Sequence, residues 1–323
     1  MARTHPRGAG GWPWGWFNLC FGHAALPFYC VQYLHVLCPW DISKINSLSY
    51  CPPRANNGLP MRSPQTAQNT RRFATFRSIS ALILREMATT YGKSAGGYVW
   101  VVLEPVLGIA LLSAVFSLAF RSPSLGTNFP IFYATGYLPY FMYMDISRKV
   151  GVSVIFSRAL LSYPPVTFLD AVLARFFLNF MTHVVVFYVL ITGIELVFET
   201  HTLHNYSYMV KAMLMAAVLG LGIGSLNCFL WSLFPAWQRI WGIINKPLFI
   251  LSAVLYVLED VPETYRKYLW FNPLVHITAE MRKGFYPSYN GDFISPLYVY
   301  GISLTTMVAG FFLLLHFHKR ILN

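Results

Sequence analysis

Apolar residues gather into long runs separated by short polar breaks, and this pattern predicts membrane-spanning helices. A hydrocarbon core about 30 Å thick is crossed by about 20 mainly apolar residues in helical conformation. Six runs of this chain suit such a span, at about 97–120, 130–147, 170–197, 208–233, 240–258 and 296–316. The predicted fold class is therefore all-α, in a polytopic membrane protein with six transmembrane helices.

The segment before the first predicted span has a different helical pattern. Between Arg71 and Gly92, basic residues lie opposite a mainly apolar face formed by Phe73, Phe76, Ile79, Ser80, Ile83, Met87 and Tyr91. Such a helix buries its apolar side at the lipid boundary, so we predict an interfacial amphipathic helix at 73–92 that does not cross the membrane. The alternative is a cytosolic helix packed on its own domain, but no such domain follows.

The run Pro247–Tyr286 starts as a membrane helix and then loses that pattern. It breaks at Glu259-Asp260, turns again at Asn272-Pro273 and ends in a basic pair, Arg282-Lys283. Broken helices at membrane depth persist only where protein covers the backbone or where it lines a cavity. We therefore predict re-entrant helices at 259–290 that form an extracytoplasmic gate.

Residues 1–70 show neither helical nor strand periodicity. We expect them to form a poorly ordered extension, for which a start-site artefact with natural translation from near Met61 is one explanation. The second domain, 71–323, is the transmembrane domain. The candidate ligands for a zinc site in this extension match no common ligand spacing, so no metal is predicted. They are Cys20, His23, Cys30, His35 and Cys38.

Composition agrees with a membrane protein, since 56% of the residues are apolar and only 11% are charged. The net charge of +12 comes from dispersed basic residues without a recognition fingerprint, so nucleic-acid binding is not expected. Eleven of the 24 basic residues fall on the side of the two termini, namely Arg71, Arg72, Arg77, Arg85, Lys93, Arg148, Lys149, Arg158, Arg239, Lys319 and Arg320. Six fall on the opposite side, namely Arg121, Lys211, Arg266, Lys267, Arg282 and Lys283. This moderate bias predicts that both termini are cytoplasmic.

Four stretches together resemble the ABC-2-type permease subunit of bacterial capsular polysaccharide and O-antigen exporters, a type V ABC exporter. They are REMATTYGKSAGGYVWVVLEPVLG at 85–108, GYLPYFMY at 136–143, SRALLSYPPVTFLDAVLARFF at 157–177 and KPLFILSAVLYVLEDVPETYRKYLWFNPLVHITAEMRKGF at 246–285. The resemblance covers most of 71–323 and nothing in 1–70. One departure is Ser252-Ala253, where the family often has Ser-Gly.

The resemblance implies that two copies pair in the bacterial inner membrane, each with a separate cytoplasmic ATPase subunit. A lipid-linked polysaccharide would pass between the copies, and periplasmic or outer-membrane export proteins are further expected partners. The chain should hold no cofactor, with ATP and Mg on the ATPase. The sequence agrees with the absence of a nucleotide site in this chain, because Met87 occupies the position at which a phosphate-binding loop ending in Gly92-Lys93 would need glycine.

Three groups of site residues follow from this resemblance and from the residue types. The first is a coupling contact to the ATPase, made by Arg85, Glu86, Arg158, Leu160, Leu161, Tyr163 and Pro164. The second is a translocation path lined by Glu104, Tyr133, Tyr137, Tyr140 and Tyr143. The third is the gate, with Trp270, Asn272, Pro273, His276, Glu280 and Arg282.

Each group has a plainer explanation. An ordinary interfacial turn would account for the coupling loop, and aromatic belts anchor any membrane protein. Glu104 is followed by Pro105, and it could cap a local break or pair with Lys246 instead of lining a path. Asp170 and Arg175 suggest an ordinary anchor, and His183 and Glu195 have no assigned role.

Catalytic residues are not predicted, because the candidate acids and nucleophiles are scattered over different spans. The leading hypothesis is the permease of a polysaccharide exporter. The alternatives are an ABC-2-type exporter of a lipid, a drug or a teichoic-acid-like polymer, and a membrane-bound glycosyl- or acyltransferase.

Overall fold

The computed structural model describes residues 74–91, 96–161, 167–198 and 204–317, and the regular structure in these ranges is all helical. This confirms the all-α class for the described residues. The predicted extension, 1–70, lies outside them. The elements are α2 (Ala74–Glu86), the π-helix η3 (Met87–Tyr91), α3 (Gly97–Ala119), α4 (Phe129–Gly151), α5 (Ser153–Leu161), α6 (Phe168–Phe198), α7 (Tyr206–Leu233), α8 (Pro235–Leu251), the 3₁₀-helix η4 (Leu258–Asp260), α9 (Glu263–Trp270), α10 (Pro273–Phe285) and α11 (Pro296–His316).

Within the described residues, four helices are long and apolar enough to cross a membrane, namely α3, α6, α7 and α11. A polytopic membrane protein follows from these four. The helix α4 is as long as α3 but carries Asp145, Arg148 and Lys149 in its last two turns. It packs against α3, α6, α7 and α10. Because neighbouring helices surround most of α4, its side chains need not suit lipid.

The span predicted at 240–258 differs from the structure, in which α8 ends at Leu251. Two residues later Ala253 has φ = 53°, in the left-handed region that L-amino acids rarely adopt. This residue turns the chain out of the helical path before the acidic pair. Glu259 and Asp260, predicted to break the helix, instead belong to η4. The break therefore comes earlier than the charge pattern indicates.

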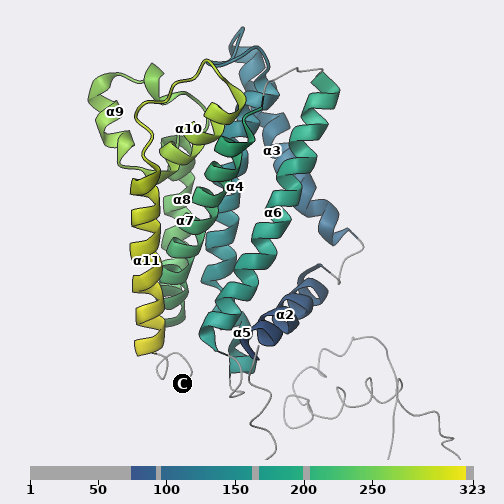
Figure 1. Ribbon diagram of the computed structural model, residues 1–323, viewed down its shortest axis with the longest axis vertical. Coiled ribbons are helices and arrows are strands. Elements are labelled where there is room, and N and C mark those ends of the chain that lie inside the picture. Colours follow the sequence, from purple (N-terminus) through teal and green to yellow (C-terminus); the bar gives the residue numbers. More distant parts are fainter. Residues whose placement is uncertain (1–73, 92–95, 162–166, 199–203, 318–323) are drawn as a thin grey trace, which may run out of the picture. The chain divides into compact units, whose positions relative to one another are not determined.

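Two groups of described helices lie at opposite ends of the helical bundle (Figure 1). α2, α5 and the last turn of α11 lie at one end, which we call the α2 end. α9 and α10 lie at the other, which we call the α10 end. α2 packs against the first part of α6. Its predicted apolar face includes Phe76, which is 72% exposed.

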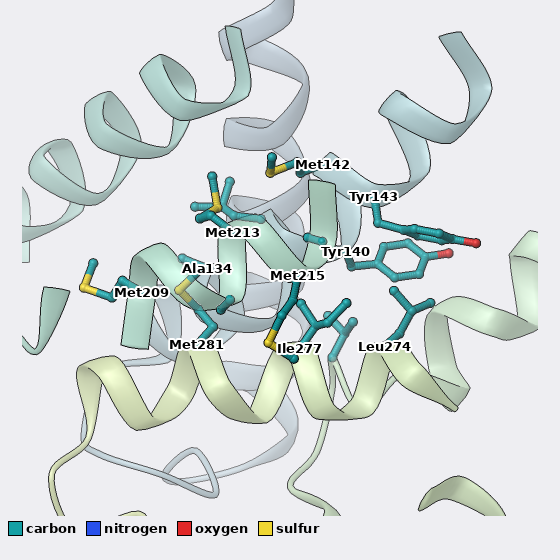
Figure 2. Packing of buried hydrophobic residues seen from close by; sticks show 14 of the residues in the cluster. Ala134, Tyr140, Met142, Tyr143, Met209, Met213, Met215, Leu274, Ile277 and Met281 are labelled. Carbon is teal, nitrogen blue, oxygen red and sulfur yellow. The ribbon is translucent and has the colours of Figure 1, made fainter. Parts of the chain in front are cut away.

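The core lies where α4, α7 and α10 meet, and methionine fills much of it (Figure 2). Flexible thioether side chains fit the irregular space between helices that cross at different angles. The methionines in this cluster are Met142, Met209, Met213, Met215 and Met281.

Glycines let α7 approach its two neighbours closely. A Cβ on Gly220 or Gly224 would lie 3.1 Å or 2.8 Å from side chains of α4. On the other side, a Cβ on Gly222 would lie 2.4 Å from the Ser303 carbonyl oxygen of α11. From α11, Gly310 returns the contact, since its Cβ would lie 2.6 Å from the Leu226 backbone nitrogen. Small residues therefore set the α7–α11 distance, as in many membrane helix pairs.

We predict that Gly310→Ala destabilises the protein by about 1–3 kcal/mol, because the added methyl group forces α11 away from α7. Gly301→Ala on the same helix is the matched control, since nothing lies within 4 Å of its Cβ position. Thermal unfolding of the purified protein in detergent measures both. Equal melting temperatures for the two variants would contradict the close packing.

Candidate functional site

A cavity of about 560 Å³ lies between α4, α7 and α8. Each of α4 and α8 contributes residues three and four positions apart, which places them on one helical face. Aromatic side chains dominate the lining, and the polar groups among them include two cations and two amides, with no carboxylate. The lining consists of Tyr137, Tyr140, Phe141, Met144, Arg148, Trp231, Gln238, Trp241, Gly242, Asn245, Lys246 and Phe249.

The aromatic rings of the cavity hold one another in place. The ring of Phe249 stands edge-on to both Tyr137 and Tyr140, with centroids 6.2 Å and 5.2 Å apart. Tyr137 also stacks on Phe141 at 5.7 Å. The Tyr140 hydroxyl donates to the Asn245 carbonyl oxygen at 3.0 Å, which joins α4 to α8. The lining is thus built on helices rather than on loops, mainly α4 and α8 with Trp231 from α7.

The predicted path tyrosines divide into two pairs. Tyr137 and Tyr140 line the cavity, whereas Tyr133 and Tyr143 are not among its lining residues. Burial does not separate the pairs, since Tyr140 is as buried as Tyr133 and Tyr143. Tyr133 packs against the rings of Phe116 and Phe132, with centroids 5.2 Å away in each case. The structure therefore brings only half of this predicted stripe to the cavity wall.

Glu104 lies on the exposed side of α3, next to the buried Pro105. Among the described ion pairs none joins it to Lys246. One turn along α3, Gly108 lies against the ring of Tyr137, where a Cβ would come within 2.7 Å. α3 therefore packs closely against Tyr137 at this position.

Arg282 organises the α10 end. Its side chain is 1% exposed, and its guanidinium donates to the carbonyl oxygens of Val254 at 3.0 Å and Tyr256 at 2.7 Å. The ring of Phe132 on α4 lies 4.6 Å from the guanidinium carbon. The chain between α8 and η4 has left the helix, so its carbonyls need donors. Arg282 supplies two of them. Gly136 leaves room, because its Cβ would lie 2.9 Å from the Val254 oxygen.

Asn272 connects the broken ends of two helices. Its side-chain oxygen accepts from the Leu274 amide at 3.1 Å and caps α10, in which Pro273 is the first residue. Its amide nitrogen donates to the Leu251 carbonyl oxygen at 3.1 Å, the last residue of α8. One side chain thus satisfies an orphan group at each helix end.

His276 and Trp270 tie α9 and α10 to the start of α11. The Ser295 amide donates to His276 Nδ1 at 3.3 Å, so the other ring nitrogen carries the proton toward the Trp270 carbonyl oxygen at 2.9 Å. Trp270 stacks on Tyr298 at 5.1 Å and donates to the Phe293 carbonyl oxygen. Trp270 and His276, two of the predicted gate residues, therefore hold α9, α10 and the start of α11 together.

The two-residue spacing of Glu280 and Arg282 predicts that they do not face each other on a helix, and in the structure they have different partners. Glu280 is buried and pairs with Lys211 of α7 at 2.8 Å. These two residues attach α10 to different neighbours, Glu280 to α7 and Arg282 to the loop after α8.

A second cavity, of about 420 Å³, opens among the loops of the α10 end, with Glu259, Asp260, Arg266, Tyr289 and Asp292 in its wall. The Tyr289 hydroxyl donates to Glu259 Oε2 at 3.1 Å. Burial, together with the neighbouring Glu259 carboxylate, raises the pKa of Tyr289 above its usual value. The phenol therefore keeps its proton and remains a donor in this contact.

Two charged clusters at the α2 end were not predicted. Asp145 is buried against His183 Nε2 at 2.9 Å and Lys149 Nζ at 3.0 Å. Arg175 pairs with Glu86 at 2.9 Å, not with Asp170 as the sequence suggests. Polar residues in predicted spans signal such partners, but the choice of partner depends on how the helices pack.

Asp170 instead serves the start of α6. It accepts from the Thr167 amide at 3.0 Å, and the Thr167 hydroxyl accepts from the Asp170 amide at 3.2 Å. This reciprocal pair is a capping box, and it explains the local role of both residues.

The predicted coupling residues are only partly described. Arg85 and Glu86 are half-buried in α2, toward α5 and α6, and Arg158 is exposed on α5. The side chains of Leu160 and Leu161, and the residues Tyr163 and Pro164, lie outside what the structure describes. Their assignment to an ATPase contact stays a prediction.

The fold and these sites define a polytopic helical membrane protein with an aromatic cavity and a buried polar framework at one end. No family model matches the chain. It is 29% identical to the polysialic acid transport protein KpsM of Escherichia coli over 233 residues, which is 72% of this chain and 90% of that protein.

Two further relatives carry the same kind of name. The capsule polysaccharide export inner-membrane protein CtrC of Neisseria meningitidis serogroup B is 27% identical over 247 residues, 76% of this chain and 92% of that protein. The capsule polysaccharide export inner-membrane protein BexB of Haemophilus influenzae is 25% identical over 211 residues, 65% of this chain and 79% of that protein. These homologues confirm the resemblance to capsule-exporter permeases.

We predict that position 253 accepts glycine but not valine. Ala253→Gly relieves about 1–2 kcal/mol of left-handed strain and loses about 0.8 kcal/mol of methyl burial, so the net change is small. Ala253→Val places a β-branched side chain at φ = 53° in a buried site and lowers the melting temperature in detergent. Equal stability of Ala253→Val and wild type would show that the turn is not constrained.

We predict that Arg282→Met destabilises the protein by about 3 kcal/mol, because the buried Val254 carbonyl and the partly buried Tyr256 carbonyl lose their donor. The loss of stability in Arg282→Lys should lie between zero and that of Arg282→Met, since an ammonium group cannot reproduce the planar fork of the guanidinium. The neighbouring Lys283→Met is the control, and it should cost less than about 1 kcal/mol, as it removes only a contact with the Tyr208 ring. Melting in detergent compares the three variants, and similar losses for Met at 282 and 283 would contradict the role of Arg282.

Proposed function

We propose that this chain is the transmembrane permease subunit of an ATP-driven ABC transporter that exports a lipid-linked polysaccharide across the bacterial inner membrane. The observation that carries the proposal is its similarity, over most of its length, to capsule polysaccharide export inner-membrane proteins. The same observation supports a bacterial inner-membrane location.

The cavity between α4 and α8 has the chemistry that a polysaccharide requires. Sugar rings stack their apolar C–H faces on aromatic rings, and Tyr137, Trp241 and Phe249 present such rings in the lining. Hydroxyl groups find donors and acceptors on Gln238 and Asn245. We propose that this cavity is part of the translocation path.

A second copy of the chain would complete the path. No residue of α8 is buried in the single chain. Most of α3 is likewise open, with Glu104 on its exposed side. A carboxylate directed outward from a span is costly in lipid. A homodimer that brings α3 and α8 against a partner would cover both helices, and this supports the pairing that the resemblance implies.

In this proposal six helices cross the membrane, with α4 and α8 as the second and fifth spans. η4, α9 and α10 form a re-entrant gate on the extracytoplasmic side. The α2 end is cytoplasmic, in agreement with the positive residues near both termini. Periplasmic export proteins would meet the α10 end.

The work of transport comes from a separate cytoplasmic ATPase subunit that binds ATP and Mg. The chain is therefore a transport subunit without a reaction of its own. α5 and the residues after it, together with α2, would contact the ATPase.

The test is export in a strain from which the gene for this chain has been deleted. We expect polysaccharide to accumulate inside these cells, and the restored chain to return it to the surface while co-purifying with an ATPase. Export of a different lipid or polymer would overturn the substrate assignment. Transferase activity of the isolated chain, without any ATPase, would overturn the transporter.

We predict that Trp241→Ala lowers the export rate about threefold to tenfold, as the loss of about 1 kcal/mol of ring stacking implies. Tyr188→Ala is the control, because this aromatic residue is exposed on α6 and does not line the cavity. Surface polysaccharide, normalised to the amount of each variant in the membrane, gives the comparison. Equal export by the two variants would argue against the cavity as the path.

A further inference from the structure

Arg175 joins three other helices at the α2 end. It belongs to α6 and is 5% exposed. One nitrogen of its guanidinium lies 2.9 Å from Glu86 Oε1 of α2, and another donates to the Lys149 carbonyl oxygen of α4 at 3.1 Å. Its flat face lies over the ring of Phe156 in α5, with 4.3 Å to the centroid. A single planar group therefore contacts α2, α4 and α5.

The charges around this junction are arranged so that Glu86 is the carboxylate that meets Arg175. The guanidinium of Arg85 lies further away, 5.6 Å from the centroid of the same Phe156 ring. On α4, Lys149 has its own partner, Asp145, at 3.0 Å. A buried cation with one carboxylate, one carbonyl and one ring holds all three in a fixed relation. Lysine cannot make these contacts together, because it lacks the planar fork.

The junction adjoins the cavity through a single turn of α4. Arg148 lines the cavity and pairs with Asp145 at 3.1 Å, and the next residue, Lys149, offers its carbonyl to Arg175. On the other side, Phe156 belongs to α5, which leads into the segment predicted to contact the ATPase. α5 follows α4 after a single residue, Val152, and α2 packs on α6. A displacement of α2 or α5 therefore moves the contacts of Arg175 together with this end of α4.

We propose that Arg175 is a positioning residue for transport, which keeps α2, α5 and the cavity end of α4 in one mechanical unit. This inference rests on the proposed function. It assigns the guanidinium, with Glu86 and Phe156, as a side-chain connection between the ATPase-facing helices and the path, in addition to the direct chain link from α4 to α5. If the contact only stabilised the fold, its loss would lower the amount of protein and leave the ratio of transport to hydrolysis unchanged.

The experiment uses the complete complex with its ATPase, in the deletion strain and after purification. Arg175→Lys keeps the charge but loses the fork and the stacked plane, and Phe156→Leu removes the ring while leaving the ion pair. Arg121→Lys is the matched control, because this arginine is exposed beyond the end of α3. We expect both test variants to retain ATP hydrolysis while polysaccharide exported per ATP hydrolysed falls about tenfold.

Two results would overturn the inference. One is an unchanged ratio of export to hydrolysis in both test variants. The other is a parallel fall in export and hydrolysis that follows the amount of complex in the membrane. If Arg175→Lys fails to accumulate, Phe156→Leu decides, since its side chain is 43% exposed and its loss leaves no sealed cavity. Failure of the wild-type chain to export polysaccharide would instead overturn the proposed function, and this inference with it.

Discussion

The α10 end of this protein depends on a buried arginine that binds backbone carbonyls. A chain that leaves the helix inside a membrane protein exposes carbonyl groups that lipid cannot satisfy. Arg282 binds two of them, and Asn272 binds the last carbonyl of α8. Both side chains are near or within α10, so the helix that follows the break also holds the break in place. The re-entrant arrangement proposed for the gate needs such a device.

At the α2 end a buried arginine, Arg175, has a different role. Arg175 binds a carboxylate, a carbonyl and an aromatic ring from three helices, whereas Arg282 serves mainly one loop. Between these ends, α7 supplies a tightly packed support, because its glycines bring it close to α4 and α11. The cavity lies beside this support, and α8, which has no buried residue in the single chain, forms one of its walls. Rigid support next to an uncovered helix suits a path completed by a second copy.

Some of the candidate site could be predicted from the sequence, and the reasons differ between residues. The gate residues around Asn272-Pro273 occupy a short stretch of chain, so local capping rules already bring them together. The position of the break is harder to predict, since the charge pattern marks Glu259-Asp260 whereas the left-handed turn occurs at Ala253. The path tyrosines share a helical stripe, but the direction in which each ring points depends on the helices packed around α4. Tyr137 and Tyr140 therefore line the cavity, while Tyr133 and Tyr143 do not.

The sequence alone determined the all-helical class, the membrane character and the resemblance to capsule-exporter permeases, because apolar run length and short local motifs carry these properties. Only the tertiary structure decided the partners of the buried charges. Arg175 pairs with Glu86 and not with Asp170, His183 pairs with Asp145, and Glu280 pairs with Lys211. Each of these pairs joins residues distant in the chain, and their choice follows from which helix faces meet. Local periodicity does not predict these partners, since a charged residue in a predicted span indicates only that some partner exists.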